Sequence, residues 1–333
     1  MIKYSVIMPV YNAEIFLDKN LLLFKNLKRK DVELLIINDG SNDKSLEKIK
    51  SYSIDNCVII NQENHGVSYS RNVGIEGARG KYISFLDCDD FLNDEIFEIL
   101  DRYVKGKYDV IRYGFNFYDG TNYIPYKLTE KKILYKKNDI LKLLLETMST
   151  FKNNSVWNQF IRRDLLIERK LRFNTTHKYA EDLEFNVNLI LNCNSVCVLP
   201  MCLYNYYVND SGITKSINYN DVVKCTMDAI DVYTNNIKIS IKYNIVDKKV
   251  IKHSVNEITG NVKKMFLNKN IKFKEKMNFI NKVQKMDDIH YLKKIIKEYK
   301  LKITIFDYLL IFSKIKILIF MTFQLWGNIK KKE

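Results

Sequence analysis

The stretch Lys81-Tyr-Ile-Ser-Phe-Leu-Asp-Cys-Asp-Asp90 joins an apolar strand directly to a cluster of carboxylates. Further apolar runs at 4–10, 33–37 and 58–60 have the length of strands, and helical patterns lie between them. Uninterrupted apolar strands that alternate with helices indicate a mostly parallel, doubly wound α/β sheet covered on both faces. We expect the helices at about residues 13–27, 43–52 and 66–78.

Polar side chains follow three of these strands. Tyr11-Asn12 follows the first strand, Asn38-Asp39-Gly40 the second, and the carboxylates of 87–90 follow the strand at 81–86. In doubly wound sheets, ligands bind beyond the carboxyl ends of the strands. The sequence therefore predicts one binding site built from these three segments.

The rest of the chain is predicted to be mixed and then helical. Strands are expected at 110–118 and 195–208, and helices near 138–148, 155–168 and 182–191. From residue 219 the sequence becomes helical and rich in Lys and Asn. This shift in composition places a domain boundary near residue 215, between a domain at 1–215 and a basic helical region at 216–333.

Composition and charge narrow the class of protein. The 333 residues are 47% hydrophobic with only 3 Pro and 11 Gly, which excludes a disordered or collagen-like chain. The formal net charge is +15, and residues 240–333 carry nearly all of it, with 22 Lys or Arg against 8 Asp or Glu. Residues 1–239 hold 32 against 31, so this part has no basic surplus suited to nucleic acid.

The cysteines and the N-terminal run give two expectations about the compartment. None of the six Cys forms a CxxC pair, and no His completes a zinc pattern, so we expect reduced thiols in a cytosolic protein. The apolar run at 4–10 is too short for a signal peptide. We therefore expect no export by that route.

The acidic cluster allows two interpretations. Asp87 and Asp89 suit a hard divalent cation that is held together with a bound phosphate. The alternative is an acidic turn that caps the next helix, for which Asp90 and Asn93-Asp94 are suitable. Asp39 is equally open, because it can bond a nucleoside or close the turn with Gly40.

Two further segments carry candidate side chains. Arg71 can donate to a base carbonyl or a phosphate, although a solvent-facing Arg is the commoner outcome on a helix. Asn72 and Gly74 are poor helix formers, which indicates that something other than propensity placed them. Glu181-Asp182 opens an apolar helix, where the dipole favours carboxylates without any function. A carboxylate that faces an acceptor hydroxyl is also what a general base requires.

Taken in order, five segments resemble family 2 glycosyltransferases of the GT-A fold. They are Ser5–Asn12, Ile36–Ser41, Gly66–Gly74, Gly80–Asp90 and Glu181-Asp182, and the match covers roughly residues 3–210. The resemblance implies a GT-A catalytic domain with a Rossmann-like nucleotide-binding half, followed by an α-helical C-terminal region. It extends to no pattern after about residue 240.

The resemblance also implies a role for each matched residue. On the donor side, a nucleotide cleft is lined by Pro9, Tyr11, Asn12 and Glu14, with Asp39 on the base (expected to be uracil), Arg71 on the base or diphosphate, and Asp87 on the ribose. Asp89 ligates a divalent metal, Mn²⁺ or Mg²⁺, that bridges the diphosphate. Asp182 matches the catalytic base of an inverting transfer. The acceptor side is implied to include Trp157, Asn158 and Glu181.

Two departures from the family pattern weaken parts of this assignment. Gln159 stands where similar enzymes have Lys, which puts a charged contact to the acceptor in doubt. The loop Asp210–Thr214 lacks the Arg or His that often precedes it, which puts that part of the metal site in doubt.

The function that the resemblance implies is a metal-dependent hexosyl- or N-acetylhexosaminyl-transferase of cell-surface polysaccharide synthesis. Its donor is expected to be a UDP-sugar and its acceptor a glycan or lipid-linked glycan. Alternatives are a GDP- or dTDP-sugar donor, or a non-catalytic subunit of the same fold that binds a membrane or a partner. A Rossmann dehydrogenase is excluded, because no Gly follows the first strand at 10–15.

The basic region ends in the apolar segment 303–326, which is interrupted by Asp307, Lys314 and Lys316. The two Lys disfavour a spanning helix. A Lys-rich helical surface beside an apolar segment favours an anionic membrane surface over nucleic acid. We expect a cytoplasmic protein, peripheral on the inner face of the cell membrane. A helix packed within the protein or in a homo-oligomer is the alternative for 303–326.

Overall fold

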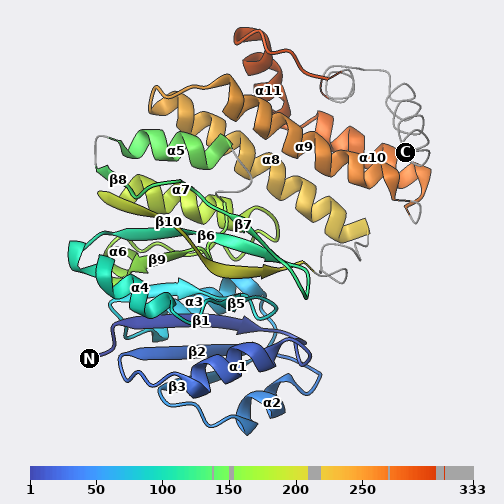
Figure 1. Cartoon of the computed structure of the whole chain (residues 1–333). Helices are drawn as coiled ribbons and strands as arrows, with labels where there is room; N and C mark the ends of the chain where they lie inside the picture. Colours follow the sequence, from blue (N-terminus) through green and yellow to red (C-terminus); the bar gives the residue numbers. More distant parts are fainter. Residues whose placement is uncertain (137–138, 150–153, 209–218, 269–270, 305–310, 312–333) are drawn as a thin grey trace. The chain divides into compact units, whose positions relative to one another are not determined.

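The computed structural model describes residues 1–136, 139–149, 154–208, 219–268, 271–304 and 311 (Figure 1). These residues fall into two compact units. The first comprises Met1–Leu144, Lys152–Thr175 and Glu184–Ser211, and the second comprises Leu145–Phe151, Thr176–Leu183 and Gly212–Glu333.

The first unit is built on one sheet that its helices cover. The strands in spatial order are β3 (Cys57–Gln62), β2 (Val32–Asp39), β1 (Tyr4–Val10), β4 (Tyr82–Phe85), β9 (Gln159–Arg162), β6 (Val110–Tyr118), β10 (Ser195–Tyr207) and β5 (Phe91–Leu92). Two short strands lie off this path, β7 (Tyr123–Tyr126) beside β6 and β8 (Ile133–Lys136) beside β10. Its helices are α1 (Leu17–Asn26), α2 (Ser45–Ser51), α3 (Val67–Gly77), α4 (Ile96–Tyr103), the 3₁₀ turn η1 (Val104–Gly106) and α6 (Arg163–Glu168).

The N-terminal part of the sheet is parallel, as the apolar strands predicted. β1 pairs in parallel with both β2 and β4, and β2 pairs in parallel with β3. The seven residues of β1 and the eight of β2 are all buried, which explains why these strands show no polar alternation. β9 runs antiparallel to β4 and β6, and β6 and β10 are parallel to each other. The predicted α/β fold class is confirmed.

One expected helix is wrong. The sequence pattern predicted a helix over 155–168, but 155–158 form neither helix nor strand, and strand β9 and the short helix α6 follow them. β9 lies between β4 and β6, and Val156 to Ile161 are all buried. A short segment that is buried on every side has no periodicity from which strand and helix can be told apart.

Two helices connect the units. α5 (Ile140–Ser149) and α7 (Glu181–Asn192) each contribute residues to both. The second unit is otherwise the helical C-terminal region that the sequence predicted, with α8 (Tyr219–Lys242), α9 (Lys248–Leu267), α10 (Phe273–Gln284) and α11 (Asp287–Glu298). Within it α8 packs against α9 and α11. No helix among the described residues is both long and apolar enough to cross a membrane, and of the segment 303–326 only residues 303, 304 and 311 are described.

Candidate functional site

Three strands deliver the predicted site residues to one edge of the sheet. Val10 lies opposite Asn38 in the β1–β2 ladder, and Ile7 lies opposite Phe85 in the β1–β4 ladder. Because the three strands are parallel, the segments that follow them leave the same edge. The structure therefore brings residues 11–12, 38–40 and 87–90 to the same edge, as predicted.

The first two of these segments are bonded to each other. Asn12 has a left-handed φ of 47°, its N–H donates to Ser41 Oγ at 3.0 Å, and its Oδ1 accepts from the Asn42 N–H at 2.7 Å. Glu14 Oε2 accepts from the Lys44 N–H at 3.2 Å. The side chains of Asn12 and Glu14 thus hold the loop before α2.

An open polar hollow lies at the ends of β2 and β3. It has a volume of about 780 Å³ and is lined by Asn38, Gly40, Ser41, Asn42, Leu46, Asn61, Gln62, Glu63 and Asn64. Of the predicted cleft residues nearby, Pro9 is buried in β1 and Tyr11 is 43% exposed. The hollow offers amide and carboxylate groups to a polar ligand.

Asp39 is buried, and its side chain holds the loop before α3 by hydrogen bonds. Its carboxylate accepts from Gln62 Nε2 at 2.7 Å and from the N–H groups of His65 and Gly66 at 3.0 and 2.8 Å. Only 3% of the residue is exposed. Gly66 has a φ of 90°, a conformation that glycine adopts without strain. The three bonds fix the start of α3 relative to β2.

Arg71 of α3 reaches the acidic segment. Its Nη2 pairs with Asp87 Oδ1 at 3.0 Å, and its guanidinium lies 5.2 Å from the centre of the Phe173 ring. Arg71 is 3% exposed, whereas the Asp87 side chain is 31% exposed. The solvent-facing Arg considered from the sequence is wrong, and the pair presents one anchored cation and one accessible carboxylate.

Asn72 explains why this helix carries a poor helix former. Its Nδ2 donates to the Phe173 carbonyl at 2.9 Å, and its Oδ1 accepts from the Phe173 N–H at 2.8 Å. The two bonds hold Phe173 beside Arg71. Sequence reasoning missed Phe173, for which the only signal was the unexplained Asn within the helix.

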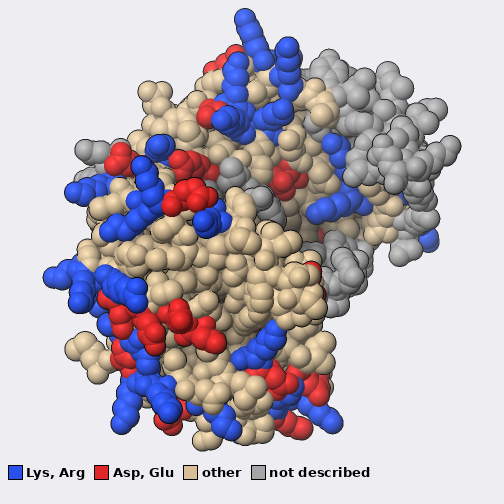
Figure 2. All heavy atoms as spheres, in the orientation of Figure 1, with Lys and Arg blue, Asp and Glu red and all other residues tan. Residues whose placement is uncertain are grey.

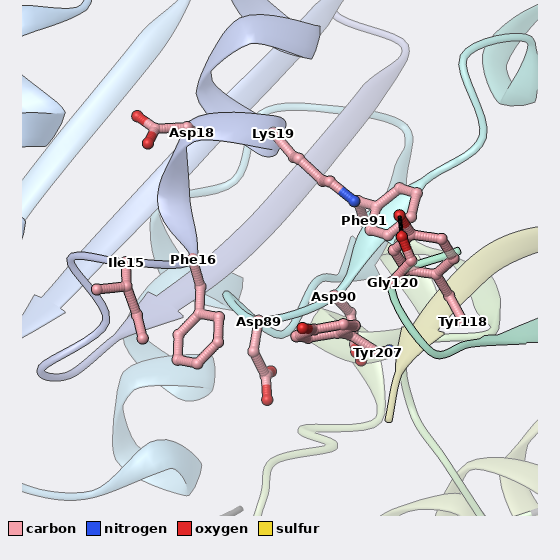
Figure 3. A pocket seen from close by; sticks show the side chains of 10 residues that line it. All are labelled: Ile15, Phe16, Asp18, Lys19, Asp89, Asp90, Phe91, Tyr118, Gly120 and Tyr207. Carbon is pink, nitrogen blue, oxygen red and sulfur yellow. Dashed lines mark hydrogen bonds between the residues drawn. The ribbon is translucent and has the colours of Figure 1, made fainter. Parts of the chain in front are cut away.

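Asp89 lines a separate cavity of about 400 Å³ (Figure 3). The other lining residues are Ile15, Phe16, Asp18, Lys19, Asp90, Phe91, Tyr118, Gly120 and Tyr207. Lys19 Nζ lies 4.2 Å from the ring centres of both Phe91 and Tyr118, which is within range of cation–π attraction. Sequence reasoning missed the aromatic lining of the cavity, of which β6 and β10 bring Tyr118 and Tyr207 from far along the chain.

The capping interpretation is wrong for Asp90, whereas Asn93 Oδ1 accepts from the Glu95 N–H at 2.9 Å, directly before α4. Asp90 is 2% exposed, and its carboxylate accepts from the Tyr204 hydroxyl at 2.7 Å and the Tyr207 N–H at 2.8 Å. Burial, together with the charges of Asp87 and Asp89, raises the pKa of Asp90 well above its usual range. Asp90 is therefore a buried link from the acidic segment to β10.

The predicted acceptor-side residues Trp157 and Asn158 are buried. Trp157 is 6% exposed and stacks on Tyr204, with ring centres 4.2 Å apart and planes inclined by 14°. Asn158 is 1% exposed, and its carbonyl accepts from the Tyr113 N–H at 3.1 Å. Gln159 donates to Asn186 and accepts from Arg112. Direct contact of Trp157 with an acceptor therefore stays a prediction, and its contact with Tyr204 is a structural fact.

Glu181 and Asp182 begin α7 and belong to the second unit. Ala180, directly before them, has a φ of 60°, which is uncommon for a residue with a Cβ. Within the same unit, the preceding loop is held by the Lys178 N–H on Asp228 and by the Tyr179 hydroxyl on Glu257, at 2.8 and 3.0 Å. Sequence reasoning missed both of these carboxylates. The participation of Asp182 in the site stays a prediction.

The carboxylates of the acidic segment are the candidate ligands for a metal ion. Among the described residues, no three Asp, Glu, His or Cys side chains are grouped so as to hold a metal ion by themselves. Asp87 is paired with Arg71, Asp90 is buried, and Asp89 is a lining residue of the cavity. A site of this kind fits a divalent ion that takes its remaining ligands from phosphate and water, as Mg²⁺ usually does. The loop Asp210–Thr214 lies outside the described residues.

The chain is similar in sequence to known glycosyltransferases. It is 32% identical over 218 residues to the uncharacterized glycosyltransferase EpsJ of Bacillus subtilis, covering 63% of this chain and 62% of EpsJ. It is 28% identical over 305 residues to the poly(ribitol-phosphate) beta-N-acetylglucosaminyltransferase TarP of Staphylococcus aureus, covering 86% of this chain and 88% of TarP. Against glycosyltransferase GlyA of Streptococcus pneumoniae, the match spans 32% of the relative's length.

The fold is also found among solved structures. The crystal structure of S. aureus TarS 1–349 in complex with UDP-GlcNAc superposes with a TM-score of 0.67 at 19% identity, covering 99% of this chain and 92% of that one. This likeness identifies the fold as GT-A. Residues 5–169, which contain β1, Asp39, Arg71 and the acidic segment, match the family model Glycosyl transferase family 2. Because this match includes the predicted motifs, and because the structure places these motifs at one edge of the sheet, the chain belongs to glycosyl transferase family 2.

Proposed function

We propose that the chain is an inverting glycosyltransferase that moves a hexose or N-acetylhexosamine from a UDP-sugar to a growing cell-surface glycan. The observation that carries the proposal is the edge at which Asp39, the Arg71–Asp87 pair and Asp89 lie in one unit. A buried Arg beside an accessible carboxylate suits a ligand with both a sugar hydroxyl and a phosphate. A nucleoside diphosphate sugar has both.

Each side chain of the donor site has a separate task in this proposal. The polar hollow beside Asp39 receives the base, and Asp87 bonds the ribose hydroxyls while Arg71 holds Asp87 in place. Asp89 holds the divalent ion, Mn²⁺ or Mg²⁺. When bound, the ion would offset the negative charge that develops on the leaving diphosphate.

Asp182 is proposed to accept the proton of the acceptor hydroxyl. The acceptor oxygen forms its bond to the anomeric carbon on one face while the bond to the diphosphate oxygen breaks on the other, so the configuration inverts. Holding the two sugars in line supplies much of the rate enhancement. The left-handed Ala180 and the bonds to Asp228 and Glu257 fix the backbone from which Asp182 extends.

The relatives support the choice of donor and pathway. TarP is named as a beta-N-acetylglucosaminyltransferase, and TarS was crystallised with UDP-GlcNAc. GgaB of Bacillus subtilis, 29% identical over 221 residues, is named as a minor teichoic acid biosynthesis protein. We therefore propose UDP-GlcNAc as the first donor to test and a cell-wall polysaccharide, free or lipid-linked, as the acceptor.

Calorimetric titration with UDP, with and without Mn²⁺, tests the donor site. We expect binding that Mn²⁺ strengthens in the wild type, and loss of that strengthening in Asp89→Asn. The matched control is Asp94→Asn, which removes the same charge from an exposed position five residues along. Binding of GDP or dTDP in place of UDP would overturn the uridine assignment. Binding of none of the three would favour the non-catalytic subunit.

Release of UDP from UDP-GlcNAc in the presence of an acceptor glycan tests the base. Loss of a positioned general base costs about 10²–10⁴ in rate. We expect Asp182→Asn to lose activity on this scale while UDP affinity stays unchanged, and Glu184→Gln on the same helix to retain activity. Full activity in Asp182→Asn would remove this residue from the mechanism.

A further inference from the structure

Tyr204 of β10 bonds both ends of the acidic segment. Its hydroxyl accepts from the Asp87 N–H at 3.2 Å and donates to Asp90 Oδ2 at 2.7 Å. The residue is fully buried. Burial and the charges of Asp90 and Asp87 raise the pKa of Tyr204, so that the hydroxyl keeps its proton. A single buried hydroxyl therefore joins the two residues that flank Cys88 and Asp89.

The segment is a closed turn with further ties. The Asp90 N–H donates to the Asp87 carbonyl at 3.1 Å, which closes a four-residue turn with Asp89 at its third position. Asn20 Nδ2 of α1 donates to the Asp90 carbonyl at 2.7 Å, and Tyr207 bonds the Asp90 carboxylate through its N–H. The turn that carries Asp89 is thus held on both sides of this residue by partners in α1 and β10.

Trp157 fixes the ring of Tyr204. The two rings are stacked 4.2 Å apart, and Phe115 meets the indole edge-on at 4.9 Å. The ladder between β10 and β5 places Tyr204 opposite Leu92, directly after the turn. The stack and the ladder together hold the Tyr204 hydroxyl between Asp87 and Asp90.

We propose that Tyr204, supported by Trp157, is a positioning residue that holds Asp87 and Asp89 in the geometry that the donor requires. The inference rests on the proposed function for the identity of the donor. It also gives Trp157 a role that needs no contact with the acceptor. Partners that orient a metal ligand typically change metal affinity or activity by about 10–100-fold when they are lost.

The variant Tyr204→Phe removes the hydroxyl and keeps the ring stack. It leaves the Asp87 N–H without its acceptor and Asp90 Oδ2 without its hydroxyl donor. Tyr82→Phe is the matched control. Tyr82 is also fully buried in the sheet, and its hydroxyl donates to the Tyr108 carbonyl at 2.9 Å, away from the turn.

Hydrogen exchange of the ligand-free protein tests whether the Tyr204 hydroxyl holds the turn at 87–90. We expect the amide of Asp87 and peptides covering 86–91 to exchange faster in Tyr204→Phe than in the wild type, and Tyr82→Phe to leave them unchanged. Unchanged exchange in Tyr204→Phe would overturn the proposal, as would the same increase in Tyr82→Phe.

Titration with UDP, with and without Mn²⁺, tests the consequence for the donor. We expect the strengthening by Mn²⁺ to fall about 10–100-fold in Tyr204→Phe and to persist in Tyr82→Phe. Faster exchange with unchanged Mn²⁺-dependent binding would overturn the positioning role. A wild type that binds no nucleotide would overturn the proposed function instead. The exchange result alone would then show whether Tyr204 holds the turn at 87–90.

Discussion

At the scale of single residues, Asp39 combines a predicted ligand contact with a structural task. Its carboxylate accepts one hydrogen bond from Gln62 of β3 and two from the loop before α3, and it is almost completely buried. The sequence offered a base contact and a turn cap as alternatives. The structure shows the three hydrogen bonds that Asp39 accepts, and its contact with a base stays a prediction.

We predict that Asp39→Asn lowers both stability and UDP affinity. An amide nitrogen in place of one oxygen faces N–H donors, and each buried group left unsatisfied costs about 1–3 kcal/mol. Urea unfolding should show a loss of this size in the unfolding free energy. Glu63→Gln, beside the same hollow, is the control. Unchanged stability in Asp39→Asn would show that the three bonds contribute little.

Arg71 depends on shape as well as charge. Its planar guanidinium pairs with Asp87 and lies over the Phe173 ring at the same time, and a lysine ammonium does not reproduce both contacts. We predict that Arg71→Lys weakens UDP binding by about tenfold or more, since one lost charged hydrogen bond of this kind corresponds to about 1.5–3 kcal/mol. The control is Arg79→Lys, whose side chain is 60% exposed. Wild-type affinity in Arg71→Lys would show that charge alone is required.

At the scale of elements, Gly74 sets the distance between α3 and β1. A Cβ at this position would lie 2.3 Å from Ile7 Cγ2, so the helix cannot pack as it does with any larger residue. Gly260 of α9 has no atom within 4 Å of the same construction. A Cβ would therefore clash at Gly74 and has free space at Gly260.

We predict opposite signs for the two alanine substitutions. Gly74→Ala should lower the unfolding free energy by about 1–3 kcal/mol through overpacking, despite the better helix propensity of Ala. Gly260→Ala should raise it by about 0.5–1 kcal/mol. Urea denaturation of both variants measures the difference. Equal effects would mean that the α3–β1 packing adjusts freely.

The sequence predicted the elements whose signal is local. Buried strands such as β1 and β2 are visible as apolar runs, and the end of each run located Asn12, Asp39 and Asp87 correctly. β9 was missed because its neighbours β4 and β6, and not its own pattern, define it as a strand. The same reason hid Tyr204, which lies more than a hundred residues from the turn that it bonds. Contacts set by the register of distant strands leave no local pattern.

At the scale of the whole molecule, the second unit contains a half-buried histidine from which we expect its stability to depend on pH. His253 of α9 packs edge-on against Tyr233 of α8, with ring centres 5.7 Å apart. Burial lowers the pKa of His253 below its usual 6.5, and Glu257 opposes this shift. As the pH falls below about 6.5, the unfolded chain therefore takes up the proton first, and stability falls.

We predict a pH-dependent loss of helical structure that His253→Gln reduces. Thermal unfolding followed by circular dichroism at pH 7.5 and 5.5 should show a lower midpoint at the acid pH in the wild type. His290→Gln is the control, because His290 is exposed on α11. An equal acid shift in wild type and His253→Gln would assign the effect to other groups.

The charge of the two parts is the last property of the whole molecule with a functional consequence. Residues 240–333 carry 22 Lys or Arg against 8 acidic residues, whereas residues 1–239 are nearly balanced. Figure 2 shows both signs interspersed over the sheet unit and a cluster of blue side chains at α11. Each Lys near an anionic leaflet contributes about 1 kcal/mol, within a distance that salt shortens.

We therefore predict that the chain binds vesicles containing phosphatidylglycerol and leaves neutral phosphatidylcholine vesicles unbound. Co-sedimentation should fall as NaCl rises from 50 to 500 mM. Replacing the exposed Lys294, Lys297 and Lys300 with Gln should weaken binding, whereas the same change at the exposed Lys25, Lys28 and Lys30 of the first unit should not. Binding that does not depend on lipid charge or salt would assign attachment to apolar contact, and binding to neither kind of vesicle would overturn the expected peripheral attachment to the membrane.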